Sequence, residues 1–191
     1  WSHFGLTYFF ITRGSYIDLT KYIRTVPDFP EPGIMFRDVT TLFAEPRAFK
    51  EMIEQFNQKF NGVDIDYIGG IDARGFIIGA ALAFTRGIGF VPVRKKGKLP
   101  YDTIAEDYAL EYGTATLELH TDAVSARSKV LIVDDLIATG GTAIAAVNLF
   151  RKLNADVAGC AFLVDLPDLG GADKLRELGV NVTSLCRFSG H

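Results

Sequence analysis

Several features that would assign this 191-residue sequence to a particular class of protein are scarce or absent. It has two cysteines, Cys160 and Cys186, with no CxxC motif and no histidine spaced for metal binding, which argues against a disulfide or zinc scaffold. No apolar run approaches the roughly 20 residues that a membrane-spanning helix needs. The net charge of −3 argues against binding nucleic acid through bulk positive charge. We therefore expect a cytoplasmic protein without membrane or nucleic-acid partners.

What the sequence does contain is the composition of a folded domain. Hydrophobic residues make up 48% and charged residues 23% of the chain, which is ordinary for a globular protein. The length suffices for one domain with a sizeable core and is short for two. Residues 1–15 are rich in aromatic side chains but lack the basic start and cleavage site of a signal peptide. We treat 1–15 as an N-terminal extension of unknown role and 16–191 as a single domain.

Apolar residues recur with helical and strand periods in alternation along this domain. Strands separated by helices of about a dozen residues predict an α/β fold with a largely parallel, twisted sheet flanked by helices. A small N-terminal hood, about 16–43, is expected to lie over one edge. The polar stretch from 94 to about 108 is predicted to be a loop, the main part of a flexible lid over about 94–111. Predicted helices cover 19–26, 46–60, 75–86, 142–153 and 171–178, and predicted strands cover 67–71, 89–93, 116–120, 130–133, 157–164 and 180–185.

The segment 130–142 carries the strongest functional signal. Its four apolar residues 130–133 predict a buried strand, and two acids follow directly, Asp134 and Asp135. Ligands of open α/β sheets bind beyond the carboxyl ends of the strands. Small and hydroxylated residues come next, where a helix is expected to begin, so that backbone N–H groups can converge on a phosphate. The predicted phosphate-binding residues are Ala138, Thr139, Gly140, Gly141 and Thr142.

Two carboxylates beside a phosphate loop would repel the ligand unless the phosphate is attached to a diol. Carboxylates accept hydrogen bonds from ribose hydroxyls, and the phosphate then lies one sugar length away. Since neighbouring strand residues point to opposite faces, Asp134 and Asp135 can reach one sugar only where the strand turns, which we expect at Leu136. The sequence has no GxxxxGK[ST] loop and no GxGxxG after a strand. Gly140-Gly141 alone would more often be a simple turn, but the whole pattern predicts a ribose-phosphate site.

The same segment resembles the 5-phosphoribosyl-1-pyrophosphate (PRPP) motif of the type I phosphoribosyltransferases. Its form, VDDLIATGGT, is nearer to the adenine-specific enzymes than to the hypoxanthine–guanine or orotate enzymes. Three further segments match in order, so the resemblance extends from about Leu19 to the C-terminus. It implies purine salvage: transfer of the 5-phosphoribosyl group from PRPP to adenine, giving AMP and pyrophosphate. It also implies a homodimer and Mg²⁺ held mainly by the substrate, with no protein ligand assigned to the metal.

The resemblance also implies a pyrophosphate site. The segment Asp72-Ala-Arg-Gly75 is similar to the family's pyrophosphate loop. That loop contains a non-proline cis peptide bond, which the resemblance implies at Asp72–Ala73. Arg74 and Lys95 are expected to be catalytic, because cations neutralise charge on the leaving group. Without the other motifs, Arg74 would be a solvated arginine at a helix start, and the cations near residue 95 a solvated face. The implied pyrophosphate-binding residues are Asp72, Ala73, Arg74, Gly75, Arg94, Lys95 and Lys98, of which Arg94 is implied to be able to reach a neighbouring subunit's site.

The segment 32–38 resembles the stretch that binds adenine in this family. The resemblance implies that backbone groups of Met35 and Arg37 read the edge of the base, while Phe36 and Leu136 sandwich its ring. From the sequence alone, a place for Phe36 in the ordinary core is equally well supported.

The segment 108–113, Tyr-Ala-Leu-Glu-Tyr-Gly, resembles the family's YxLEYG signature, which closes the lid. By this resemblance Glu111 would be a catalytic residue that protonates or hydrogen-bonds adenine N7 while N9 attacks. Such a role requires a carboxyl group that is protonated near the working pH, which an apolar closed lid can arrange. Tyr112 is expected to be part of the same lid.

Two alternatives stay open at this point. The chain can be a phosphoribosyltransferase for hypoxanthine, guanine or xanthine, but relatives that use 6-oxopurines typically have a lysine near the positions that match 164–167, which read Val-Asp-Leu-Pro here. It can also be a non-catalytic PRPP-sensing regulator, although such regulators often carry a DNA-binding domain or strong basic asymmetry. The missing lysine favours adenine, and the presence of Arg74 and Glu111 favours an enzyme.

Overall fold

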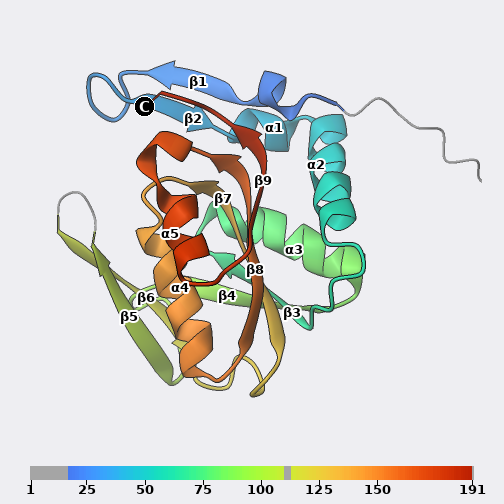
Figure 1. Cartoon of the computed structure of the whole chain (residues 1–191), viewed down its shortest axis with the longest axis vertical. Helices are drawn as coiled ribbons and strands as arrows, with labels where there is room; N and C mark the ends of the chain where they lie inside the picture. Colours follow the sequence, from blue (N-terminus) through green and yellow to red (C-terminus); the bar gives the residue numbers. More distant parts are fainter. Residues whose placement is uncertain (1–16, 110–112, 191) are drawn as a thin grey trace, which may run out of the picture.

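The computed structural model describes residues 17–109 and 113–190, which form an α/β fold (Figure 1). The predicted class, a mostly parallel sheet flanked by helices, is confirmed. Among the helices of these residues, none combines the length and the apolar character that a membrane-spanning segment requires. In chain order the elements are η1 (Leu19–Tyr22), β1 (Arg24–Pro27), β2 (Met35–Asp38), α1 (Thr40–Ala44), α2 (Pro46–Lys59), β3 (Tyr67–Ile71), α3 (Arg74–Arg86), β4 (Gly89–Lys95), β5 (Thr103–Ala109), β6 (Thr114–His120), β7 (Lys129–Ile137), α4 (Gly141–Lys152), β8 (Asp156–Asp165), η2 (Pro167–Leu169), α5 (Gly171–Glu177) and β9 (Val182–Arg187).

Within the described residues, seven strands form the main sheet in the order β5-β6-β4-β3-β7-β8-β9. The five strands from β4 to β9 in this order pair in parallel, whereas β6 and β5 continue the sheet in antiparallel pairing. Parallel pairing places the carboxyl ends of β3 and β7 side by side, with Gly70 opposite Val133. This edge of the sheet is where ligands of such folds bind.

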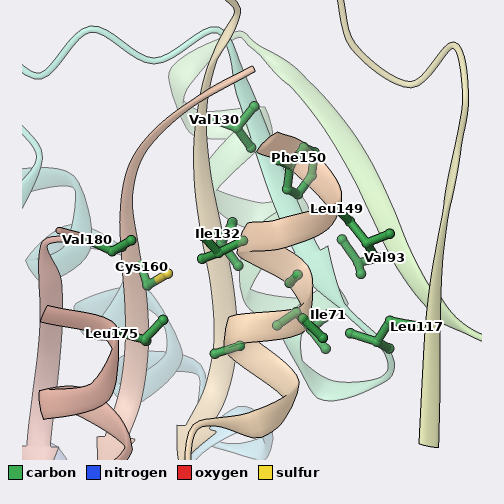
Figure 2. Packing of buried hydrophobic residues seen from close by; sticks show 14 of the residues in the cluster. Ile71, Val93, Leu117, Val130, Ile132, Leu149, Phe150, Cys160, Leu175 and Val180 are labelled. Carbon is green, nitrogen blue, oxygen red and sulfur yellow. The ribbon is translucent and has the colours of Figure 1, made fainter. Parts of the chain in front are cut away.

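The sheet is buried on both faces, as the apolar strand at 130–133 predicts. Val130 and Ile132 pack toward α4, where Phe150 is fully buried (Figure 2). Leu131 and Val133 belong to the opposite core, which includes residues of α1, α2 and α3. Gly69 in β3 leaves the space that the Phe150 ring fills, since a Cβ there would lie 2.6 Å from that ring. These two cores hold β3 and β7 in place.

The predicted helix over 19–26 is wrong. Its start is a short 3-10 turn, η1, capped by Asp18, whose Oδ1 accepts a hydrogen bond from the Thr20 amide at 3.1 Å. The chain then enters β1, which pairs antiparallel with β2, placing Val26 opposite Phe36. Over so few residues, apolar spacing does not distinguish a helix from a strand, and the partner that decides it lies about ten residues further along the chain.

The predicted loop from 94 to about 108 is also wrong in its second half. Residues Thr103–Ala109 form β5, which pairs along its whole length with β6. Ile104 and Tyr108 of β5 contact the core beneath α4, and Glu106 between them is paired with Lys152 of that helix. The opposite side of this edge strand faces solvent, so only two large apolar residues mark the strand and the segment resembles a loop in sequence.

Candidate functional site

The acidic end of β7 and the start of α3 meet at the carboxyl edge of the sheet. The Arg74 guanidinium Nε lies 2.5 Å from Asp135 Oδ2, joining segments 61 residues apart. Asp135 is buried, with 4% of its surface exposed. The structure therefore brings together Arg74, expected at the pyrophosphate, and Asp135, expected at the ribose.

Strand β7 extends further than predicted: it includes both carboxylates and ends at Ile137, so the turn expected at Leu136 is wrong, because Leu136 still pairs with Val164 of β8. Its strict alternation is nevertheless lost near them: Val133 and Leu136 pack with one core, and Ile137 with the other. Asp134 Oδ1 accepts a hydrogen bond from the Asp135 amide at 2.9 Å, so this side chain bends back along the strand. Burial, followed by the negative charge of Asp135, raises the pKa of Asp134 well above its usual value.

A hollow of about 150 Å³ lies at the start of α4. Gly140 has φ +87° and a carbonyl that accepts the first helical hydrogen bond, from the Ile144 amide at 2.9 Å. A helix start of this kind presents unpaired N–H groups and a favourable dipole to an anion. The hollow is lined by Asp134, Leu136, Ile137, Ala138, Thr139, Gly140, Gly141, Thr142 and Ala143.

The two glycines of this loop are required for different reasons. Gly140 needs its positive φ, and a Cβ there would lie 2.9 Å from the Gly171 Cα. At Gly141 a Cβ would lie 3.1 Å from the carbonyl oxygen of Ala109, at the end of β5. Gly140 thus allows the turn beside α5, whereas Gly141 allows β5 to approach the loop.

The loop after β3 contains the non-proline cis peptide bond at Asp72–Ala73 that the family resemblance implies. Asp72 Oδ2 accepts a hydrogen bond from Arg94 Nε at 3.2 Å, and the Arg94 guanidinium also lies 5.7 Å from the centre of the Phe76 ring. A Cβ at Gly75 would lie 2.9 Å from Asp134 Oδ1. The start of α3 is thereby packed directly against the carboxylates.

The cationic stretch after β4 faces solvent. Lys95 and Lys98 are exposed, and Gly97 between them has φ +77°. The Gly97 amide donates to Glu118 Oε2 at 2.8 Å, which ties the turn to β6. Lys95 ends β4, the strand next to β3, and Lys98 follows in the turn. Within the described part of the chain neither lysine makes an ion pair, so both are available to an anion arriving from solvent.

The predicted base-binding residues lie in β2 and at the end of β7. The Phe36 ring packs edge-to-face on Phe29, with centroids 5.1 Å apart, and Met35 is 37% exposed. The Arg37 guanidinium lies 4.6 Å above the Phe188 ring and donates to Thr25 Oγ1 at 2.5 Å. These side-chain contacts leave the backbone roles expected of Met35 and Arg37 as predictions.

Glu111 and Tyr112 lie outside the described residues, as does the extension 1–15. The flanking strands β5 and β6 are described, and they pair antiparallel with each other (Figure 1).

The family model of the phosphoribosyl transferase domain matches residues 38–179. The chain belongs to the phosphoribosyltransferase family. It is 58% identical over 172 residues to the adenine phosphoribosyltransferase of Dinoroseobacter shibae, covering 90% of this chain and 96% of that protein. The enzyme of Methylobacterium radiotolerans is 53% identical over 176 residues, covering 92% and 97%.

Solved phosphoribosyltransferases agree in structure as well. The adenine phosphoribosyltransferase of Thermoanaerobacter pseudethanolicus superposes with a TM-score of 0.86 at 45% identity, covering 89% of this chain and 98% of that one. The Saccharomyces cerevisiae enzyme, solved with D-2,5-dideoxy-2,5-imino-altritol 1,6-bisphosphate and adenine, gives 0.82 at 40% identity, covering 87% and 95%. The family resemblance seen in the sequence is confirmed.

Sequence reasoning missed two contacts of the turn at 138–142, the predicted phosphate loop. Gly171 at the start of α5 donates its amide to the Ala138 carbonyl at 3.0 Å, which closes this turn from the other side. Lys174 Nζ donates to the Thr139 carbonyl at 3.1 Å. The Gly170-Gly171 pair was a visible signal for a close approach, but nothing in the sequence indicated that its partner lies about thirty residues earlier.

Proposed function

We propose that this phosphoribosyltransferase transfers the 5-phosphoribosyl group from PRPP to adenine, giving AMP and pyrophosphate in purine salvage. The observation that carries the proposal is the hollow at the start of α4, where Asp134 and the backbone of a glycine turn line one small space. The named relatives, 53–58% identical, act on adenine by their names. At the end of β8 this chain has Asp165, whose Oδ2 lies 3.4 Å from Arg187 Nε. Relatives that use 6-oxopurines typically have a lysine near this position.

In this proposal the hollow takes the 5′-phosphate. The N–H groups of 138–142 and the hydroxyls of Thr139 and Thr142 bind its oxygens, with the helix dipole adding roughly 0.3–1 kcal/mol. Asp134 and Asp135 accept hydrogen bonds from the ribose hydroxyls and favour positive charge at C1′ as the bond to pyrophosphate breaks.

The leaving pyrophosphate is bound by the cations around the loop after β3. When pyrophosphate is bound, Arg74 exchanges its carboxylate partner for the phosphate oxygens, because a guanidinium can bind a carboxylate or a phosphate in a forked geometry. Lys95 and Lys98 supply further positive charge from the exposed turn, and Arg94 lies beside them. Asp72, Ala73 and Gly75 would contribute backbone N–H groups.

Adenine would lie between Phe36 and Leu136, with the backbone of Met35 and Arg37 along its edge. Leu136 supports this placement, because it is half-buried at the rim of the phosphate hollow. Glu111 would donate to N7 while N9 attacks C1′, and Tyr112 would belong to the lid that carries it.

Mg²⁺ is proposed as the cofactor, bound with PRPP. Within the described residues, no group of three or more histidine, cysteine, aspartate or glutamate side chains is placed to hold a metal ion. Mg²⁺ at phosphate sites commonly keeps several waters and uses one or two carboxylates. The two carboxylates present fit an ion that is held mainly by the pyrophosphate and ribose oxygens, where it would neutralise negative charge.

The active unit is proposed to be a homodimer. The outer face of α3 exposes Ile77 by 46% and Phe84 by 87%, two apolar side chains seven residues apart on one helix face. A second copy is the natural cover for such a face, since isologous contacts are the commonest mode of assembly. We propose that residues 16–191 form one domain, in which 16–43 acts as the hood and the segment around 94–111 as the lid.

Thr142→Ala tests the phosphate assignment. Loss of one hydrogen bond to a charged group, worth ~1.5 kcal/mol, predicts that the KM for PRPP rises about tenfold while the KM for adenine changes little. Steady-state kinetics with each substrate varied in turn gives both values. Thr85→Ala, near the far end of α3, serves as the control. Equal weakening of both substrates in Thr142→Ala would contradict a phosphate role.

A further inference from the structure

The strand β5 carries a charged residue in the middle of its inward face. Ile104, Glu106 and Tyr108 alternate along the side that faces α4, and the two apolar members contact the core there. Glu106 Oε1 accepts a hydrogen bond from Asn148 Nδ2 at 2.8 Å, and its Oε2 lies 2.6 Å from Lys152 Nζ. Lys152 Nζ also donates to the Ala105 carbonyl at 2.7 Å. One helix face thus binds both a side chain and the backbone of β5.

The two α4 residues are four apart, so they project from the same face of the helix. The Glu106 side chain is 21% exposed and that of Lys152 is 48% exposed. The hydrogen bond from Lys152, followed by that from Asn148, lowers the pKa of Glu106, so the carboxylate stays ionised in this contact at neutral pH.

The other end of β5 touches the phosphate loop. The Ala109 carbonyl oxygen and the Tyr108 ring lie 3.1 Å and 3.5 Å from where a Cβ of Gly141 would be. From Lys152 to Thr142 is about 15 Å along the helix, at 1.5 Å per residue. From Ala105 to Ala109 is about 14 Å along the strand. Strand and helix are therefore in contact at both ends of this stretch.

We propose that Glu106, Asn148 and Lys152 form an anchor that positions the β5–β6 hairpin against the phosphate loop during the reaction. This inference rests on the proposed function, because the sequence after Ala109 continues to Glu111, the expected proton donor to the base. The three are positioning residues and touch neither substrate. Because the anchor and the phosphate loop are on the same helix, the hairpin is held in a fixed relation to the bound ribose phosphate.

A half-exposed ion pair by itself adds little to stability, so the anchor should affect geometry more than folding. A displacement of about 1 Å at a reacting group can reduce rates by up to about a hundredfold. We expect Lys152→Met and Glu106→Gln to lower kcat about tenfold, with the KM for PRPP and the melting temperature close to those of the parent protein. Lys152→Arg, which keeps the charge, should restore most of the lost rate.

The control is Lys129→Met, which removes the pair of Lys129 with Asp64 at 2.5 Å, of similar lysine exposure (45%) but at the other end of β7. Its kcat should equal that of the parent. If Lys152→Met and Glu106→Gln have the same kcat as Lys129→Met, the proposed anchor is wrong.

Amide hydrogen exchange over 103–109 gives a readout that does not depend on activity. Faster exchange there in Lys152→Met than in Lys129→Met supports the anchor, and equal exchange refutes it. If the parent protein itself turns over no PRPP with adenine, the proposed function fails, whereas the exchange result still decides the inference.

Discussion

Asp134 and Asp135 place two carboxyl groups next to each other in a partly buried strand end. Arg74 compensates Asp135 directly at 2.5 Å, while Asp134 is left with a hydrogen bond from a backbone amide. Burial and the adjacent charge consequently raise the pKa of Asp134. The predicted ribose site therefore contains one ion-paired carboxylate, Asp135, and one carboxyl group, Asp134, that resists ionisation.

Asp134→Asn should therefore stabilise the protein at neutral pH. With the folded-state pKa above the unfolded value, the favourable contribution of the protonated carboxyl is complete below pH ~4 and is lost as the pH rises through the folded-state pKa. The asparagine keeps the accepting oxygen and removes the charge. The gain in unfolding free energy over the parent should grow from pH 4 to pH 8, as measured by urea denaturation. Parallel pH profiles for the two proteins would show that Asp134 ionises freely in the fold.

At the scale of elements, the predicted phosphate loop, 138–142, is closed by α5 as much as by its own glycines. The Gly171 amide binds the Ala138 carbonyl, and a Cβ at Gly171 would come within 2.6 Å of the Gly140 nitrogen. Because that contact is with backbone, a side chain at position 171 cannot be accommodated by a rotamer change.

Gly171→Ala is expected to displace the phosphate loop. Overpacking of this kind costs ~1–3 kcal/mol of stability, and the KM for PRPP should rise at least about tenfold while adenine binding is less affected. Thermal unfolding and steady-state kinetics measure the two effects. An unchanged KM for PRPP would mean that the loop does not depend on its contact with α5.

The elements that the sequence predicted well are those with long apolar periods. The helix α2 begins at Pro46 as expected and buries Met52, Ile53 and Phe56, and the strands of the parallel sheet follow from their continuous apolar runs. The segments 19–26 and 103–109 were mistaken because each is short and its structure depends on a partner strand. Strand pairing is a long-range property that local periodicity does not contain.

The candidate site divides in the same way. The turn at 138–142 is contiguous in the sequence, so its glycines and the helix that begins there could be predicted locally. The pair of Arg74 with Asp135, the closure by Gly171 and the contact of Glu106 with Lys152 join residues between 31 and 61 positions apart. These could be found only once the fold had placed the elements side by side.

At the scale of the whole molecule, the outer face of α3 should mediate dimerisation. Burying one large apolar side chain contributes roughly 1.5–3 kcal/mol, and a two-fold interface buries the Phe84 ring of both subunits. Phe84→Glu should therefore raise the dimer dissociation constant at least about a hundredfold, as measured by sedimentation equilibrium. Leu178→Glu, a similarly apolar and 43% exposed site just after α5, should leave it unchanged. A Phe84→Glu protein that is as dimeric as the parent would place the interface elsewhere.

Pyrophosphate release from PRPP and Mg²⁺, measured with adenine, hypoxanthine, guanine and xanthine in turn, tests the central claim most directly. A site that reads the base through hydrogen bonds rejects a poorly matched base by about 10³-fold or more. We predict turnover with adenine and a kcat/KM lower by at least that factor for the other three bases. Turnover with hypoxanthine but not adenine would contradict the assignment of the base site, and no release with any base would contradict the proposed reaction.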